Sequence, residues 1–249
     1  MLPCSISPRE DAIMIPDDVL KTGFAPLSTA LIADACVRLD LPIRAAPATL
    51  QALISGSHRV GRAVPVRHYG SVDIFLDVLE TTQPGDILVI DNGGRMDEAC
   101  IGDLVVLEAQ AAGLAAIIVW GVHRDTTDLL RIGFPVFSLG RFPVGPVRLD
   151  PWDDDATHVA QIGSVAVTRD DLVFADDDGV LVVAAVHGEQ VLHTAHALWE
   201  RERHQALAIH QGITLRDQVQ FRAYLARRHT DPSLTFRQHL RQIGGAIEE

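Results

Sequence analysis

The chain has 249 residues and a formal net charge of -12, and it has no apolar run close to the roughly 20 residues that a membrane span needs. The negative charge argues against nucleic acid and anionic membranes as partners. No basic stretch followed by an apolar stretch opens the chain, so we expect no signal peptide. Three widely spaced cysteines (Cys4, Cys36, Cys100) predict neither a disulfide framework nor a zinc site. These features predict a cytoplasmic protein.

The first part of the chain predicts alternating helices and strands. Residues 1–25 form a loose arm with a short helix near Asp17–Thr22, and Ser28 is expected to cap a helix that runs to Leu39. The regular segments predicted after it are strand Gly61–Arg67, helix Val72–Thr81, strand Ile87–Asp91, helix Met96–Ala112, strand Ala115–Trp120, helix Thr126–Ile132 and strand Phe134–Ser138.

The second part changes character. Val147–Val183 alternates short β-type runs with turn residues and contains no helical pattern. Beyond Val186 the pattern is helical, with predicted helices His187–Ile209, Leu215–Arg228 and Phe236–Ile243. Together the two parts predict an α/β fold, a mixed sheet covered by helices on at least one face. The helical extension that follows is only partly amphipathic and suits packing on a neighbouring subunit.

Two polar clusters follow successive buried strands. The first cluster contains Asp103, and the second contains Arg124-Asp125. In an open α/β sheet, that edge is where ligands bind. Two carboxylates, one guanidinium and several glycines suit a divalent metal and a small anionic substrate. The single lysine, Lys21, lies outside both clusters. Carbonyl chemistry at this edge is therefore expected to use a metal rather than a Schiff base.

The same residues also have purely structural interpretations. Asp125 or Thr126 could cap the helix that follows, and the two interpretations of Asp125 are equally favoured by the pattern. Asp103, considered alone, fits a polar helical residue better than a functional one. Asn92-Gly93-Gly94 lacks the spacing of a phosphate-binding loop, so a plain strand-to-helix turn is expected there.

Other polar groups match no complete motif. His193 and His196 lie one helical turn apart but lack partner ligands, so we expect a solvated helix face. The acidic runs Asp153–Asp155 and Asp176–Asp178 do not match a calcium loop and are expected to be solvated turns.

The order of motifs, from about Ser28 to Gly212, resembles the RraA-like family, which contains the 4-hydroxy-4-methyl-2-oxoglutarate aldolases and the regulator of ribonuclease activity A. The chain departs from the family pattern at Trp120-Gly121, where Asp-Gly is common. The segments that carry the resemblance are Pro84-Gly85-Asp86, Asn92-Gly93-Gly94, Ala99…Gly102-Asp103-Leu104, Ala109…Gly113…Ala116, Gly121…Arg124-Asp125, Pro135-Val136-Phe137 and Asp176-Asp177-Asp178-Gly179-Val180.

The resemblance implies a three-layer β/β/α swivelling-type domain over residues 26–212, with an N-terminal arm (1–25) and a helical C-terminal extension (213–249). It also implies homotrimers or hexamers with sites between subunits. The implied activity is that of a metal-dependent, class II type aldolase. Such a carbon-carbon lyase cleaves a 2-oxo acid in retro-aldol fashion and releases pyruvate, with Mg²⁺ or Mn²⁺ as cofactor and oxaloacetate decarboxylation as a further reaction. The alternative is a non-catalytic interaction protein.

The resemblance also implies roles for individual residues. Asp125 would bind the metal directly, Asp103 would hold it through a water, and Arg124 would contact the substrate oxygen that gains charge. The backbone N–H groups of Leu104 and Val105, beside Gly102, would receive the pyruvate carboxylate. A carboxylate from a neighbouring subunit, from Glu200 or Glu202, would complete the site.

Overall fold

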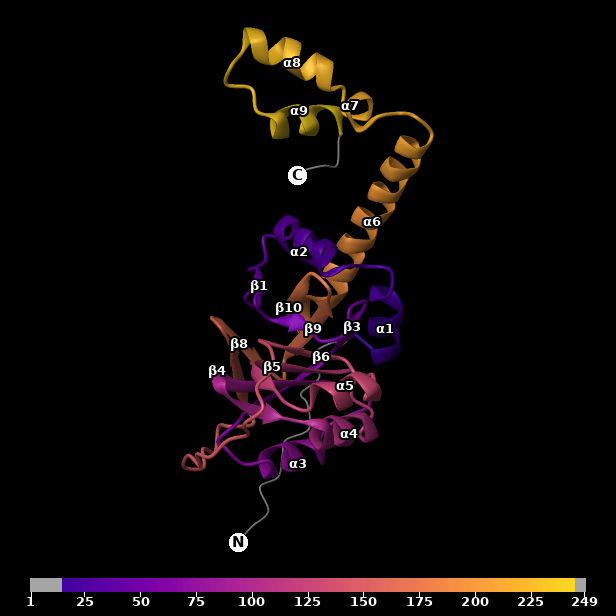
Figure 1. Ribbon diagram of the computed structural model, residues 1–249. Coiled ribbons are helices and arrows are strands. Elements are labelled where there is room, and N and C mark those ends of the chain that lie inside the picture. The colour runs from indigo at the N-terminus through magenta and orange to yellow at the C-terminus, as the bar shows by residue number, and fades with distance from the viewer. Residues whose placement is uncertain (1–14, 245–249) are drawn as a thin grey trace.

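The computed structural model describes residues 15–244 and shows a body of strands and helices from which one long helix leads to a small helical unit (Figure 1). Cys4 and most of the predicted arm lie outside the described residues. The strands are β1 (Arg44–Ala45), β2 (Gln51–Ala52), β3 (Arg59–Arg67), β4 (Ile87–Ile101), β5 (Ala116–His123), β6 (Val136–Ser138), β7 (Val159–Ile162), β8 (Val165–Thr168), β9 (Asp171–Asp176) and β10 (Gly179–Ala184). The helices are α1 (Asp17–Phe24), α2 (Thr29–Arg38), α3 (Asp73–Leu79), α4 (Asp103–Ala111), α5 (Thr126–Ile132), α6 (Gly188–His210), α7 (Leu215–Gln218), α8 (Phe221–Thr230) and α9 (Phe236–Ile243), with a short 3₁₀ turn over Ala185–His187.

One sheet has the strand order β1-β10-β9-β3-β4-β5-β6-β2, and β7 and β8 form a separate hairpin. The strands β3, β4, β5 and β6 are parallel, and α3, α4 and α5 connect them in turn. β9 runs antiparallel to β3. Because parallel strands end at the same edge of a sheet, the segments that follow β4 and β5 become neighbours.

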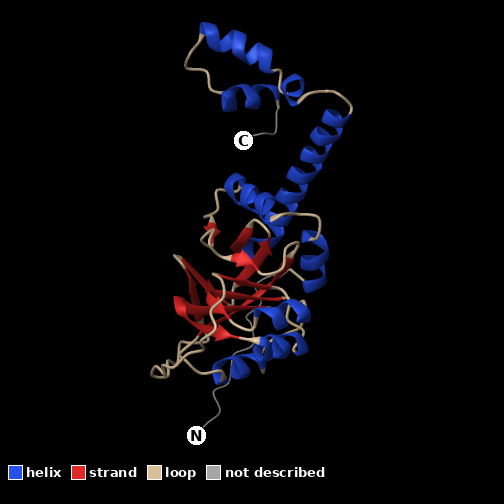
Figure 2. Ribbon diagram, viewed as in Figure 1, coloured by secondary structure: helices blue, strands red, loops and turns tan. Residues whose placement is uncertain are grey.

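The side chains of the strands alternate between two cores. In β4, Leu88 and Ile90 belong to one core, whereas Ile87 and Val89 belong to a second core with residues of β7, β8, β9 and β10. This alternation is the period of two expected of a strand that is buried on both faces. It agrees with the predicted β/β/α layers, because β3–β6 pack against α3–α5 on one face and against residues of β7, β8, β9 and β10 on the other (Figure 2).

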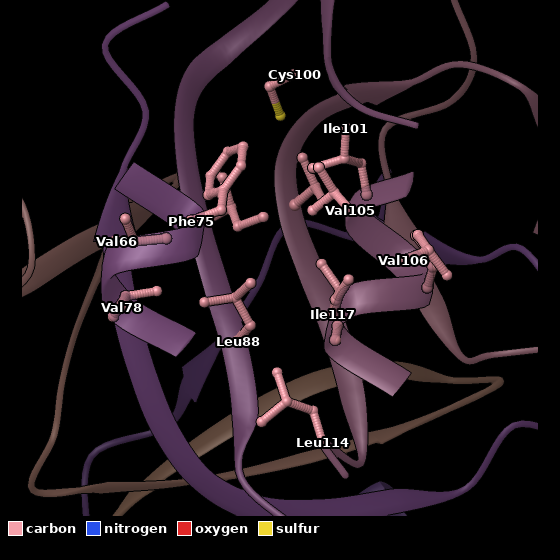
Figure 3. Close-up of a cluster of buried hydrophobic side chains, with 14 of the residues drawn as sticks. Val66, Phe75, Val78, Leu88, Cys100, Ile101, Val105, Val106, Leu114 and Ile117 are labelled. Atoms are coloured by element: carbon pink, nitrogen blue, oxygen red, sulfur yellow. The ribbon is translucent and has the colours of Figure 1, made fainter. Parts of the chain in front are cut away.

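Figure 3 shows the core beneath α3 and α4. Phe75 from α3 and Val106 from α4 pack with Leu88 and Ile117 of the sheet, and all four side chains are fully buried. Burying a side chain of this size contributes about 1.5–3 kcal/mol. The core therefore fixes the first turn of α4, which carries Asp103, against the ends of β4 and β5.

A further layer of helices covers the outer face of β9 and β10. Leu20 and Phe24 of α1 are buried there, and Phe24 meets Phe174 of β9 with 4.6 Å between ring centroids. The predicted short helix of the arm is thus confirmed and is part of the body. Ser28 caps α2 as predicted, because its Oγ accepts from Leu31 N at 3.3 Å.

The acidic run at Asp176–Asp178 is only in part the predicted solvated turn, because Asp177 and Asp178 are exposed in a turn whereas Asp176 is not. Asp176 is buried, and its carboxylate accepts from Thr29 N at 2.7 Å and from Thr29 Oγ1 at 2.6 Å. The carboxylate therefore satisfies the start of α2 together with Ser28. A pattern of consecutive aspartates could not reveal this contact, because Thr29 lies far away along the chain.

The helix predicted over Met96–Ala112 is wrong in its first part. β4 continues to Ile101, with irregular pairing to β5 after Asp91, and α4 begins only at Asp103. Gly93 and Gly94 both adopt positive φ, which turns the strand locally without ending it. Ala99 then pairs with Val122, so the segment returns to the sheet.

The helix predicted over Leu215–Arg228 is two helices, α7 and α8. Gln220 adopts a left-handed conformation with φ 49° and separates them. The helix predicted over Phe236–Ile243 is confirmed as α9 and begins with a capping box of Thr235 and Gln238. Within residues 15–244, no helix is both long and apolar enough to cross a membrane.

Candidate functional site

The two predicted polar clusters meet where β4 and β5 end. Ile101 pairs with His123 across these parallel strands, and Arg124 N donates to Ile101 O at 3.0 Å. The residue that follows Ile101, after the end of β4, is Gly102, the N-cap residue of α4. The sheet therefore places Gly102-Asp103 directly beside Arg124-Asp125.

Asp125 has an unusual backbone conformation for a residue other than glycine. It lies in the left-handed region with φ 58° and ψ 35°, immediately before α5, and its carboxylate does not cap that helix. Aspartate tolerates this conformation better than most residues. The capping interpretation is thus wrong for the side chain of Asp125, which turns instead toward the first turn of α4. Its Oδ2 lies 3.5 Å from Asp103 N.

Gly102 leaves the space that the Asp125 carboxylate occupies. A Cβ at Gly102 would overlap Asp125 Oδ2 and would lie 3.2 Å from Arg124 Nε. Its backbone is extended, with φ -141°, so any residue could adopt the conformation. Glycine is therefore required at this position because the side chains of Arg124 and Asp125 occupy the space that a Cβ would take.

Arg124 lies across the mouth of the cluster. Its side chain is 49% exposed, and its Nε is 3.4 Å from Asp125 Oδ2. On its other side, a Cβ at Gly145 would lie 2.8 Å from Arg124 Nη1. The guanidinium thus lies between two glycines, and its exposed part can meet a ligand that enters beside Asp125.

The first turn of α4 supplies backbone donors. Asp103, Leu104 and Val105 are its first three residues, and the N–H groups of a helical first turn have no acceptor inside the helix. Leu104 N donates to Asp103 Oδ1 at 2.8 Å. A ligand carboxylate that takes this N–H, as the resemblance implies, would have to displace the Asp103 side chain from it.

The cluster fits a hard divalent cation that keeps most of its waters. Asp103 and Asp125 offer carboxylate oxygens, which Mg²⁺ and Mn²⁺ prefer. Among residues 15–244 no group of three or more His, Cys, Asp or Glu side chains is placed to hold a metal. Within the described residues the cluster itself offers two carboxylates, those of Asp103 and Asp125.

Glu200 and Glu202, the predicted ligands from a neighbouring subunit, are exposed on α6. Figure 1 shows that half of the helix pointing away from α4 and α5. Glu202 instead lines a hollow between α2 and α6 with Ser28 and Trp199. Within one chain the structure does not bring either glutamate to Asp125, so their role stays a prediction about an assembly.

A buried polar network lies between β4 and the loop that contains Gly145. The sequence patterns did not predict it. Arg148 Nε donates to Glu98 Oε1 at 2.9 Å, and Arg148 Nη2 donates to Asn92 Oδ1 at 3.0 Å. His68 Nδ1 lies 2.9 Å from the same oxygen. Asn92, predicted as part of a plain turn, is thus a buried junction between β4 and the segment that contains Gly145.

That segment crosses the end of the sheet beside Arg124. Val144 O accepts from Ala99 N at 2.8 Å, and Phe142 N donates to His123 O at 2.8 Å. Together with Arg148, these contacts hold Gly145 against the Arg124 side chain. The only sequence signal was a loop rich in glycine and proline, which predicts irregular structure but no partner.

The remaining candidates have structural partners. The predicted solvated helix face is wrong for His196, whose Nε2 lies 2.5 Å from Gly23 O and joins α6 to α1, whereas His193 is exposed. Lys21 lies against Gly85, at the start of β4 and the opposite end from Ile101. Trp120 packs against Gly94 and Gly163 in the core between the strand layers. His123 is buried, with Nδ1 2.8 Å from Ser138 Oγ.

We expect His68 to make the protein less stable in acid. Burial lowers the pKa of His68 below its ordinary value of 6.5, so the unfolded chain binds a proton before the folded one. The contribution of neutral His68 to the free energy of unfolding is fully present above pH 6.5. It is lost as the pH falls from 6.5 toward the lowered pKa of the folded state, at up to about 1.4 kcal/mol per pH unit. Urea unfolding at pH 8 and pH 5.5 measures the loss.

His68→Gln is the matched variant for this measurement, because its amide can still donate to Asn92. The other ionisable groups, buried His123 among them, are present in both proteins, so the difference between the two proteins reports on His68. An equal loss of stability on acidification in both proteins would contradict the expectation.

Comparisons with known proteins agree on one family. The model of the RraA-like family, described as Aldolase/RraA, matches residues 29–182. A protein of Aromatoleum aromaticum with the provisional name 4-hydroxy-4-methyl-2-oxoglutarate aldolase is 30% identical over 122 residues, which are 49% of this chain and 76% of that protein. An Alcanivorax borkumensis protein of the same name is 29% identical over 121 residues, 49% of this chain and 74% of that protein.

Solved structures extend the likeness beyond the aligned half. An uncharacterized protein from Pseudomonas syringae pv. tomato has a TM-score of 0.71 at 26% identity, covering 81% of this chain and 96% of that one. A Streptomyces coelicolor protein, described as an unusual member of the RNase ES inhibitor RraA protein family, has a TM-score of 0.65 at 30% identity, covering 76% of this chain and 97% of that one.

Proposed function

Because the chain belongs to the RraA-like family, we propose that it is a divalent-metal-dependent lyase that cleaves a 2-oxo acid by a retro-aldol reaction and releases pyruvate. The substrate class is that of 4-hydroxy-4-methyl-2-oxoglutarate, the compound in the names of two relatives. Oxaloacetate decarboxylation is a further reaction of the same kind, since it also produces pyruvate. We propose an oligomer, a trimer or hexamer, as the working form.

The observation that carries this proposal is the convergence of Asp103, Arg124 and Asp125 around Gly102. Two strands and two helix N-termini place these residues together, and Gly102 makes room for both side chains from the second strand. Asp125 also adopts a left-handed conformation with its carboxylate turned away from its own helix, and backbone conformations of this kind recur at functional sites.

The chain's own residues divide the work. Asp125 and Asp103 would hold Mg²⁺ or Mn²⁺, which when bound would act as a Lewis acid on the 2-oxo group. Arg124 would donate to the substrate oxygen that becomes negative as the carbon-carbon bond breaks. The first turn of α4 would orient the substrate carboxylate through the N–H groups of Leu104 and Val105.

A second function is a non-catalytic interaction with another protein. It is favoured by the likeness to the Streptomyces coelicolor protein, which covers more of this chain than the aldolase relatives do. Its description names ribonuclease inhibition as the property of its family. The intact set of Asp103, Arg124 and Asp125 favours the lyase over this alternative.

A panel of 2-oxo acids tests the two functions. The purified chain is incubated with 4-hydroxy-4-methyl-2-oxoglutarate, 4-carboxy-4-hydroxy-2-oxoadipate or oxaloacetate in the presence of Mg²⁺ or Mn²⁺, and pyruvate is measured with a coupled dehydrogenase. Pyruvate release above the rate of the metal alone supports the lyase. No release from any of the panel would favour the interaction protein.

Activity is expected to disappear when divalent metal is removed, because the candidate site has no lysine that could replace it. Protein stripped with excess EDTA should show background pyruvate release, and Mg²⁺ or Mn²⁺ added beyond the chelator should restore it. Full turnover in stripped protein with EDTA present would exclude the metal-dependent mechanism.

A further inference from the structure

The helices after α6 form a unit that is too small to be stable alone. Residues 213–244 gather around a few buried side chains, Val219, Tyr224, Leu234, His239 and Leu240. Units below roughly 40 residues usually need a disulfide, a metal or a partner chain. Helices as short as α8 and α9, of 10 and 8 residues, are marginal without packing.

This unit, which we call the C-terminal hairpin (residues 213–244), stands away from the body of its own chain. α6 has 23 residues and is thus about 34 Å long, and Figure 1 shows it carrying the hairpin beyond the sheet and its helices. The body therefore does not supply the packing that the hairpin needs.

The surface of the hairpin and of the end of α6 is apolar in places. Several large apolar side chains there are 41–55% exposed: Leu207, Ile209, Ile213, Leu215 and Leu225. Exposed apolar side chains that gather in one region mark an interaction surface more often than single ones do.

The same surface is basic on an acidic protein. Residues 213–244 contain six arginines and two aspartates, whereas the whole chain has a net charge of -12. Arg216 and Arg222 are exposed, and Arg222 lies one helical turn from Leu225 on α8. A partner that fits this surface has exposed apolar side chains among carboxylates.

The chain itself contains such a surface, which we call the acidic loop (residues 149–155, LDPWDDD). Leu149 is 71% exposed and Trp152 is 53% exposed. Asp154 and Asp155, which follow Trp152, are exposed as well. The loop is held in place, because Asp150 N donates to Tyr69 O at 2.8 Å and the Trp152 ring meets Tyr69 edge-on at 5.5 Å.

The hairpin and the acidic loop lie at opposite ends of one chain. Tyr69 ties the loop to the start of α3, which is at the far end of the body from α8 and α9 (Figure 1). The two surfaces therefore cannot meet within a copy. We propose that the C-terminal hairpin of one copy docks on the acidic loop of a second copy.

Such a contact joins two different surfaces of identical chains, so it is head-to-tail. Contacts of this type close into rings when the rotation between copies permits. The matched charges would set the orientation of the two surfaces, and the apolar side chains would supply most of the affinity. The proposal does not depend on the lyase activity. The C-terminal hairpin lies outside the 29–182 segment that matches the family, and the acidic loop lies within that segment.

Photo-crosslinking tests the contact directly. A benzoylphenylalanine placed at Leu225 of the full chain is irradiated, and products are separated on a denaturing gel and mapped by mass spectrometry. We expect a product of twice the chain mass, with the crosslink within residues 147–158. The proposal would be overturned by any of three outcomes: crosslinks that form only within one chain, crosslinks to another face of a second copy, or no crosslinked product.

A charge exchange tests whether the carboxylates and arginines meet. Asp154→Arg with Asp155→Arg should lower the crosslink yield at least about tenfold, and adding Arg216→Asp and Arg222→Asp to the same chain should restore much of it. The control is Asp18→Arg with Asp34→Arg, exposed acids on α1 and α2, which change the net charge equally and should leave the yield unchanged. An equal loss in the control, or no recovery on exchange, would contradict the contact.

Discussion

Replacing Arg124 by alanine is expected to lower kcat for 2-oxo acid cleavage by about 10²-fold or more, with little change in metal affinity. A guanidinium is always protonated and cannot bind a cation. Its half-exposed position beside Asp125 leaves part of the guanidinium open to a substrate oxygen. An interaction that strengthens as charge develops acts on kcat more than on binding. Steady-state pyruvate release at saturating Mn²⁺, with calorimetric titration of the metal, measures both quantities.

Two further variants make the measurement specific. Arg124→Lys should recover little activity, because lysine presents a point charge at a different reach between Gly102 and Gly145. Arg131→Ala is the control, since Arg131 lies on α5 in an exposed pair with Asp128, and such pairs contribute little. A native kcat in Arg124→Ala at saturating metal and substrate would remove the catalytic role and favour the interaction protein.

Most strands and helices of the body could be predicted because their signals are local. The apolar run of β4 and the capping serine of α2 depend on neighbouring residues alone, and the structure confirms both. The arrangement in layers was implied by the family resemblance. The sequence also predicted that Asp103 and Asp125 share one edge of the sheet, since parallel strands end at the same edge. The predicted strand ended at Asp91, however, and Asp103 reaches that edge because β4 continues to Ile101.

The errors arose where a distant contact overrides a local pattern. Met96–Cys100 reads as helical with α4, yet Ala99 pairs with Val122 of β5 and keeps the segment in the sheet. Asp176 resembles part of a solvated turn, but it is buried against Thr29. In both cases the partner is remote in sequence, so propensity and composition contain no information about it.

Details of the candidate site were beyond the sequence for a similar reason. The pattern left the capping and ligand interpretations of Asp125 equally favoured, and only the backbone conformation separates them. The network of Arg148, Asn92 and His68 joins three segments that no motif connects. Gly145 fits no motif either, and its relation to Arg124 appears only when the loop lies against the site.

Replacing Asp125 by asparagine is expected to weaken Mg²⁺ or Mn²⁺ binding by at least about 100-fold. Loss of an outer-shell partner commonly costs 10–100-fold in metal affinity, and a direct ligand should cost at least as much as the upper end. Asparagine keeps the shape of the side chain and tolerates φ 58°, as alanine would not. The variant therefore removes the negative charge without disturbing the turn before α5.

Asp103→Asn separates the two predicted carboxylate roles. If Asp103 acts through a water, its variant should lose metal affinity by only about 10–100-fold. Asp128→Asn, an exposed aspartate one turn along α5, is the control and should bind metal as the native chain does.

The Arg124–Asp125 pair is more than one-third exposed on both sides, so its loss should change the free energy of unfolding little. Calorimetric metal titration and urea unfolding of all three variants measure these effects. Native metal affinity in Asp125→Asn would mean that the cation binds elsewhere, and the convergence around Gly102 would then need another explanation.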